Sequence, residues 1–369
     1  MLSLIKKQDW LLNLTILFLA ISSLLILYSV GSDFFWRQVF WFIVVFIVIL
    51  SFSLVDWRSL MSYRWLMLLI YLAVVLLLGL TLIFAPTIRS SKSWLVIGPL
   101  RFQTAEFAKV ALILMLSYFF ARRHIAIANW ENIFKSFVYF IILAILVLLQ
   151  PDLGSVLIFS SIWLGFLLVS GIPWRYIFIG LAVFIIISPV AWQYLLKDYQ
   201  KERVIAVFNT EYSPLKVNYG VNQSKIAIGS AGFWGKGFDQ GTQVRLGFLP
   251  EAQSDFVFAA FVEEWGFFGG SLIISAFAFL IFRIVKIGLA AENNFARLVC
   301  LGVIIMMLAH FTLNVGSAVG LLPVVGVSFP FLSYGGSNLL ANAILVGIIQ
   351  GIMARSSFFR GMPLLMESR

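Results

Sequence analysis

The feature that most constrains this chain is a series of long apolar runs separated by polar segments. A helix needs about 20 mostly apolar residues to cross the hydrocarbon core of a bilayer. Because lipid offers no partner to an open sheet edge, such runs cross membranes as helices. The sequence therefore predicts an all-α polytopic membrane protein of about ten transmembrane helices, near residues 11–30, 39–55, 66–84, 104–121, 136–150, 153–171, 176–196, 256–282, 298–320 and 339–354.

The composition excludes a soluble globular protein. Only 11% of the 369 residues are charged and 62% are hydrophobic, whereas soluble domains carry roughly 25% charged residues. The single cysteine, Cys300, excludes a disulfide framework, and two histidines, His124 and His310, leave little for a His-ligated metal site.

The net charge of +10 could suggest a nucleic-acid partner, but its distribution indicates membrane anchoring. If the N-terminus is cytoplasmic, the Lys and Arg excess gathers in the inner loops and the outer segments are nearly neutral. We therefore expect a multi-pass protein with both termini in the cytoplasm, in contact with membrane lipid and not with nucleic acid.

Two polar segments on the predicted outer face stand apart from the other loops. Residues 85–103 carry several cations and lead into the fourth span, and residues 197–255 form a long loop rich in glycine and in charge of both signs. Loops of such length are usually functional, and glycine allows close approach to a ligand. We expect the 197–255 loop to handle substrate, with a solvated connector as the alternative.

Several ionisable residues lie inside or at the edge of a predicted span, where desolvation of a charge costs free energy. Such residues are functional candidates. Glu106 and Lys109 are three residues apart on one helix face, so they can form a structural ion pair or the wall of a pocket for an anionic headgroup. Asp152 follows Pro151 and can cap the next helix. Asp255 can likewise cap a helix, or can act as a general base.

Residues 321–338 are mostly apolar but contain two prolines and several glycines, which preclude a regular helix. Irregular backbone at membrane depth requires surrounding protein or a watery cavity. We expect a re-entrant segment that lines a cavity open to the outer face. His310 and Asn314 are four residues apart on the ninth span and can face the same cavity, although a buried, satisfied histidine is the simpler interpretation.

These stretches together resemble the SEDS (shape, elongation, division and sporulation) family, the ten-span bacterial membrane proteins of peptidoglycan synthesis. The short termini resemble RodA, the elongation member, more than the division member FtsW. The resemblance extends over nearly the whole chain and is carried by residues 94–109, 150–155, 223–243, 248–266 and 322–337.

The resemblance implies a glycosyltransferase that polymerises lipid II at the outer face of the cytoplasmic membrane during cell elongation. Asp255 matches the family's catalytic aspartate in the long outer loop. Positions important in the family correspond to Arg101, Glu106, Lys109 and Asp152. The resemblance also implies a partner, a class B penicillin-binding protein, whose transpeptidase cross-links the new strands.

For this reaction we expect Asp255 to accept the proton of the attacking sugar hydroxyl, in an inverting transfer that forms a β-1,4 product. The developing pyrophosphate charge needs positive partners, for which we predict Arg101 and Lys109, then Arg203, Lys225 and Lys236. A divalent cation, Mg²⁺ or Mn²⁺, could share this task, although no ligand spacing demonstrates a site. The alternatives are a lipid II flippase and a non-catalytic scaffold of the elongation machinery.

Overall fold

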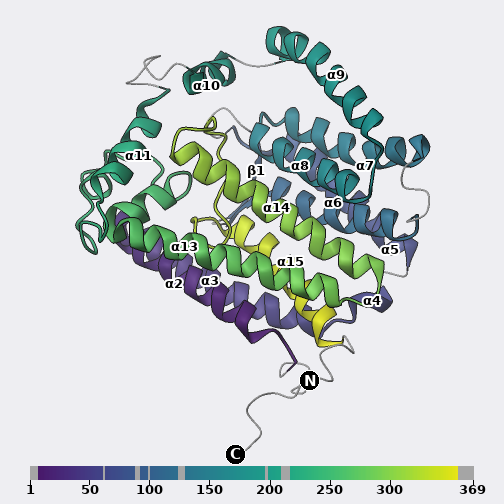
Figure 1. Cartoon of the computed structure of the whole chain (residues 1–369), viewed down its shortest axis with the longest axis horizontal. Coiled ribbons are helices and arrows are strands. Elements are labelled where there is room, and N and C mark those ends of the chain that lie inside the picture. Colours follow the sequence, from purple (N-terminus) through teal and green to yellow (C-terminus); the bar gives the residue numbers. More distant parts are fainter. Residues whose placement is uncertain are drawn as a thin grey trace, which may run out of the picture.

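The structure, a computed structural model, describes residues 7–60, 63–87, 92–98, 100–123, 129–195, 198–208 and 217–355. Each of the ten predicted spans falls on a helix (Figure 1). These helices are α2 (Trp10–Val30), α3 (Ser32–Leu54), α5 (Arg64–Phe84), α6 (Thr104–Ala121), α7 (Trp130–Leu148), α8 (Leu153–Val169), α9 (Trp174–Val190), α13 (Val257–Ala290), α14 (Asn294–Ala318) and α15 (Gly336–Ala354). The shorter helices are α4 (Trp57–Leu60), the π-helix η1 (Ala191–Leu195), α10 (Asp198–Phe208), α11 (Tyr219–Ser230) and α12 (Thr242–Arg245).

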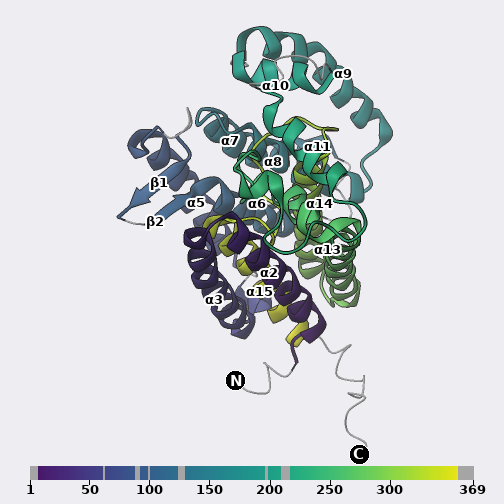
Figure 2. The same ribbon diagram turned by 90° about the vertical axis from the view of Figure 1, so that its left-hand side faces the viewer.

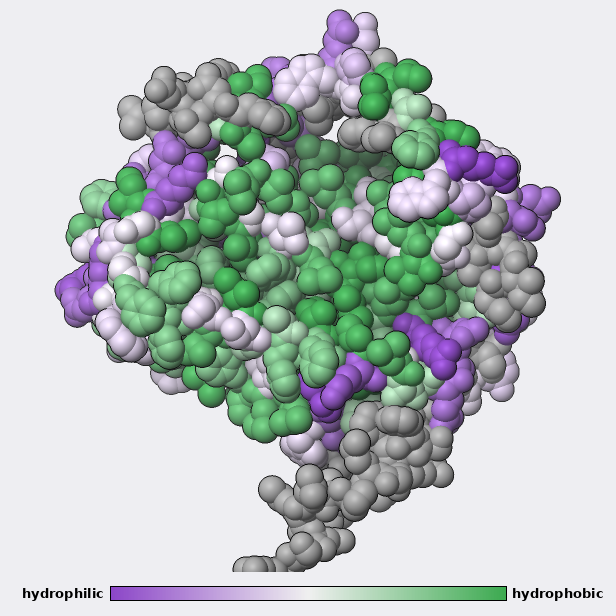
Figure 3. All heavy atoms as spheres, viewed as in Figure 1, coloured by the Kyte–Doolittle hydropathy of each residue, from purple (hydrophilic) through white to green (hydrophobic). Residues whose placement is uncertain are grey.

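Within the described residues, eight helices are long and apolar enough to cross a membrane, and α8 is a shorter apolar helix of 17 residues. The centre of the bundle is formed by α6 and α15, each with 89% of its apolar window buried, against 28% for α3 and α5. The apolar side chains that α5 leaves exposed, such as Leu69 and Leu76, therefore suit contact with lipid. A broad hydrophobic surface covers the face seen in Figure 3. These features confirm the prediction of an all-α polytopic membrane protein.

The polar segments that the sequence singles out have structure of their own. Strands β1 (Trp94–Ile97) and β2 (Leu100–Gln103) form an antiparallel hairpin in the 85–103 segment, on the side of the molecule opposite α9 (Figure 2). The 197–255 segment carries α10, α11 and α12, and α9 and α10 stand off from the bundle. Between α14 and α15 the chain is irregular, as its prolines and glycines predict.

Helix α13 is broken near its start, which the sequence did not reveal. Gly266 has non-helical backbone angles, φ 70° and ψ −173°. At this break the 232–237 loop runs alongside the helix, where Phe267 N donates to Gly232 O and Gly237 N donates to Glu264 O, both at 3.0 Å. The break thus supplies backbone donors and acceptors that attach the 232–237 loop to the bundle.

Candidate active site

Asp255 lies two residues before α13, in a turn held by its backbone. The Asn314 side-chain amide donates to Asp255 O at 3.1 Å. Ser333 Oγ donates to Ser254 O at 2.8 Å, and Tyr334 N donates to Gln253 O at the same distance. Phe256 occupies the N-cap position of α13, so the alternative that Asp255 caps this helix is wrong.

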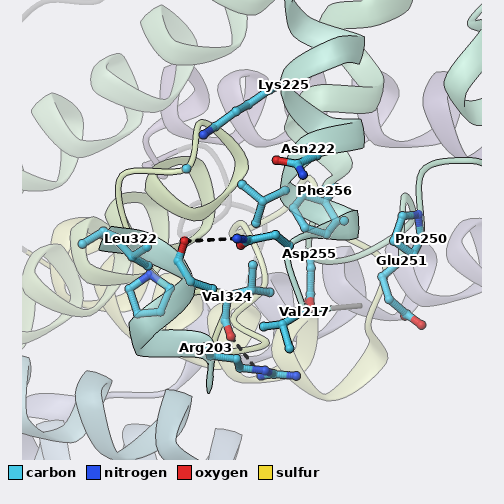
Figure 4. Close-up of a pocket in the computed structure, with 17 residues that line it drawn as sticks. Arg203, Val217, Asn222, Lys225, Pro250, Glu251, Asp255, Phe256, Leu322 and Val324 are labelled. Atoms are coloured by element: carbon cyan, nitrogen blue, oxygen red, sulfur yellow. Dashed lines mark hydrogen bonds between the residues drawn. The ribbon is translucent and has the colours of Figure 1, made fainter. Parts of the chain in front are cut away.

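A cavity of about 200 Å³ opens beside Asp255. Its walls come from α10, α11, the turn before α13 and the segment that follows α14. Figure 4 shows Lys225 and Arg203 approaching from opposite sides of the cavity with Asp255 between them, while Glu251 points away. The cavity therefore combines the Asp255 carboxylate with two cations, and positive charge is what an anionic substrate requires. Gly220 and Asn222 of α11 also line the cavity.

The cation Lys225 packs closely against the segment that follows α14. Gly320 has φ +78°, which favours glycine, and a Cβ there would lie 2.3 Å from Lys225 Cε, so the end of the lysine side chain would have to shift. One residue earlier on α11, Ser224 Oγ donates to Ala318 O at 2.7 Å. Gly220 also packs closely, in this case against Phe256, since a Cβ at this glycine would be 2.9 Å from the Phe256 ring. These contacts fix α11 against both sides of the cavity.

Arg203 comes from α10, and its Nη1 donates to Val324 O at 2.9 Å. This bond joins α10 to the irregular segment after α14, of which Leu322, Pro323 and Val324 line the cavity. The expectation that this segment lines a cavity is therefore confirmed.

Glu106 and Lys109 form the ion pair that their spacing predicts, with Lys109 Nζ 2.7 Å from Glu106 Oε1. Both are buried within the bundle, and neither belongs to the walls of the Asp255 cavity. Asn338 of α15 donates to the second Glu106 oxygen at 3.0 Å, and His310 Nε2 lies 3.1 Å from Lys109 Nζ. The pair is thus part of a polar cluster that joins α6, α14 and α15.

Asp152 is the N-cap of α8, as the sequence predicted. Its carboxylate accepts from Ser155 N at 3.0 Å and from Ser155 Oγ at 2.9 Å. It also accepts from Gln103 Nε2 at 2.9 Å, which joins the end of β2 to the start of α8. Arg101 lies on β2 with an exposed side chain and is not among the residues that line the Asp255 cavity.

Lys236 lies at the break in α13 and is likewise outside the residues that line the cavity. Its Nζ is 2.6 Å from Glu263 Oε1, and it also donates to Thr242 Oγ1 at 2.8 Å. The structure thus brings together Asp255, Arg203 and Lys225, whereas the other predicted site residues are distributed among separate clusters.

Over the residues that the structure describes, no group of three or more His, Cys, Asp or Glu side chains could hold a metal ion. His124 lies outside the described residues. Among the described residues that line the cavity, two carry carboxylates, Asp255 and Glu251, and Glu251 Oε2 accepts from Gln253 Nε2 at 3.2 Å. This donor set does not form a metal centre by itself, and a divalent cation remains a prediction.

A model of the FtsW/RodA/SpoVE family, described as cell cycle protein, matches residues 5–357. The chain belongs to this family. The match confirms the resemblance to the SEDS proteins, since it spans almost the whole chain. The peptidoglycan glycosyltransferase MrdB of Escherichia coli K12 is 36% identical over 269 residues, which cover 73% of this chain and 72% of MrdB.

Solved structures of family members have the same fold. One is a chain of a peptidoglycan synthase complex that coordinates polymerization and crosslinking; it has a TM-score of 0.82 at 28% identity, covering 94% of this chain and 97% of that chain. Another is the rod shape determining protein RodA of Thermus thermophilus, with a TM-score of 0.71 at 26% identity, covering 94% of this chain and 96% of RodA.

Two features of this family member escaped the sequence reasoning. Asn222, three residues before Lys225 on α11, lines the cavity. Figure 4 shows its side chain among the sticks that surround the cavity. The i, i+3 spacing was the available signal, because it places both side chains on one helix face. The second feature is the contact of His310 with Lys109, 201 residues apart in sequence, for which the sequence carried no signal.

Proposed function

We propose that this protein is a peptidoglycan glycosyltransferase that polymerises lipid II into glycan strands at the outer face of the cytoplasmic membrane, with Asp255 as general base. The observation that carries the proposal is the position of Asp255 in a cavity between Arg203 and Lys225. The name of its relative MrdB supports the same activity.

The reaction needs one base and positive charge. The acceptor's sugar 4-hydroxyl attacks the anomeric carbon of the donor, and Asp255 takes the hydroxyl proton as the new glycosidic bond forms. The bond from the anomeric carbon to the donor's pyrophosphate breaks on the opposite face, so an α-linked donor gives a β-1,4 product. Undecaprenyl pyrophosphate already leaves readily, and therefore no second carboxylate is needed as an acid.

Arg203 and Lys225 are the groups that stabilise the departing pyrophosphate, because they flank the carboxylate. Lys109 is enclosed in its pair with Glu106, and Arg101 is carried by the β-hairpin. The cavity thus favours Arg203 and Lys225 as the direct partners of the phosphates. In the prediction from the sequence, these two cations came after Arg101 and Lys109. Asn222 adds an amide that can donate to and accept from sugar substituents.

The orientation follows from the charge pattern. Lys and Arg gather at one set of ends of the predicted spans, and such an excess is typical of the cytoplasmic side, which supports cytoplasmic termini and an outer 197–255 segment. A substrate with a membrane-bound lipid tail and an outer sugar headgroup suits a cavity at this end of the helices. A class B penicillin-binding protein is the proposed partner, supported by the related chain's complex, which coordinates polymerization and crosslinking.

The test is polymerisation of purified lipid II by the protein in nanodiscs, with and without its transpeptidase partner, with glycan length read on a gel. Asp255→Asn preserves the shape of the side chain but removes the base. We expect a glycan ladder from the unchanged protein and none from Asp255→Asn, with equal lipid II binding. A ladder that survives in Asp255→Asn refutes the general base; no ladder from the unchanged protein, even with its partner, refutes the activity.

A further inference from the structure

Asn314 is the residue through which α14 reaches the backbone of Asp255. It is 1% exposed, and its Nδ2 faces three carbonyl oxygens: Val327 at 2.8 Å, Asp255 at 3.1 Å and Ser254 at 3.4 Å. One amide thus ties together the turn that carries the proposed base and the irregular segment that follows α14. The three carbonyls can only accept hydrogen bonds, so this position requires a donor.

The same two segments are also joined directly. Ser333 Oγ donates to Ser254 O at 2.8 Å and accepts from Phe329 N at 2.8 Å. Tyr334 N donates to Gln253 O at 2.8 Å. The 327–334 segment is therefore the surface on which the turn before α13 rests, and its own position determines where Asp255 lies.

The 327–334 segment is also held by His310, one helical turn before Asn314 on the same face of α14. His310 Nδ1 lies 2.9 Å from Ser328 O, and Nε2 lies 3.1 Å from Lys109 Nζ. An ammonium only donates, so Nε2 accepts from Lys109 and Nδ1 donates to the Ser328 carbonyl. The Lys109 ammonium is in turn fixed by Glu106 at 2.7 Å.

We propose that Asn314 and His310 are positioning residues for Asp255, and that Glu106 and Lys109 affect the reaction through them and not by touching substrate. This proposal rests on the proposed function. None of the four residues lines the Asp255 cavity, but all four lie on one hydrogen-bonded route to it. A displacement of about 1 Å from the productive geometry can cost about 100-fold in rate.

The decisive variant is Asn314→Asp, which keeps the size of the side chain but offers only acceptors to three carbonyls. We expect kcat of lipid II polymerisation to fall about 100-fold, with KM and lipid II binding within about twofold of the unchanged protein. The matched control is Ser317→Ala on the same helix, whose hydroxyl bonds only to Asn314 O of its own helix; its kcat should stay unchanged. Equal kcat in Asn314→Asp and Ser317→Ala overturns the proposal.

Two further variants cover a folding failure of Asn314→Asp. Ser333→Ala removes the second link to Ser254 and should lower kcat in the same direction. His310→Gln keeps a donor and an acceptor and should retain more activity than His310→Leu. A loss of lipid II binding equal to the loss of kcat in these variants overturns the proposal, because the residues would then shape the binding site itself.

Hydrogen exchange separates this proposal from the proposed function. We expect the amides of Phe256 and Tyr334, which donate to Glu251 O and Gln253 O, to exchange faster in Asn314→Asp than in Ser317→Ala. This readout needs no polymerisation, so it stays informative if the unchanged protein makes no glycan. Unaltered exchange at both amides contradicts the positioning role whatever the reaction is.

Discussion

Lys236 Nζ lies 2.6 Å from Oε1 of Glu263, a carboxylate with no exposed surface. The same carboxylate accepts from Thr242 Oγ1, Gln243 N and Val244 N at 3.1, 2.9 and 3.3 Å. Glu263 is therefore the point at which residues 236–244 are fixed to α13. The burial of this carboxylate thus reflects attachment of the loop, and Lys236 neutralises its charge.

Replacing Lys236 with Met should destabilise the protein and leave the cavity intact. Removing one partner of a buried ion pair leaves an uncompensated charge and costs about 3 kcal/mol or more. We expect a lower midpoint of thermal unfolding in nanodiscs, with lipid II binding unchanged at a temperature where the variant is folded. An unchanged midpoint with lost lipid II binding would instead return Lys236 to the substrate site.

Replacing Lys225 with Met should lower activity more than stability, in contrast to Lys236→Met. Its ammonium lines the Asp255 cavity, and loss of a group that stabilises developing charge costs roughly 100-fold in rate. We expect kcat/KM for lipid II polymerisation to fall by about this factor, with the unfolding midpoint less affected than in Lys236→Met. The comparison is matched, because each variant removes one lysine of the same 197–255 segment. Equal kcat/KM in the two variants would disprove the assignment of Lys225 to the pyrophosphate.

The sequence predicted what depends on local pattern. Apolar runs located the spans, the i, i+3 spacing predicted the Glu106–Lys109 pair, and proline and glycine predicted the irregular segment after α14. It could not select which cations face Asp255, because α10 and α11 reach the cavity only through tertiary packing on Val324 and Gly320.

The break in α13 was hidden for a similar reason. Gly266 sits in an apolar, helix-compatible run, and a single glycine in such a run only weakens a helix. What requires the break is the 232–237 loop, which comes within bonding distance of the helix backbone. A pattern within one segment cannot report a contact with a residue that lies 31 positions earlier in the sequence, at Gly235.

Gly266→Ala should therefore be among the most disruptive small substitutions in the chain. At φ 70° a Cβ would lie 2.3 Å from Gly235 N and from Phe233 O, both backbone atoms that cannot move aside. The left-handed conformation alone costs about 1–2 kcal/mol for a residue with a Cβ. We expect the free energy of unfolding to fall by more than this amount, measured as a reduced yield of folded protein and a lower unfolding midpoint. Gly229→Ala is the control, since its Cβ would meet nothing within 4 Å; equal stability of both variants would contradict the packing.

Two substitutions of Asp152 separate its role as a helix cap from a role of its charge in the reaction. Its carboxylate caps α8 and accepts from Gln103 Nε2, and asparagine caps a helix about as well as aspartate. Asp152→Asn should therefore keep lipid II polymerisation within about twofold of the unchanged protein, whereas Asp152→Ala should lose about 1 kcal/mol of stability through the missing cap. Both effects are measured on one preparation, by glycan yield and by thermal unfolding. If Asp152→Asn folds normally but makes no glycan, the charge of Asp152 takes part in the reaction, and its role as a cap is secondary.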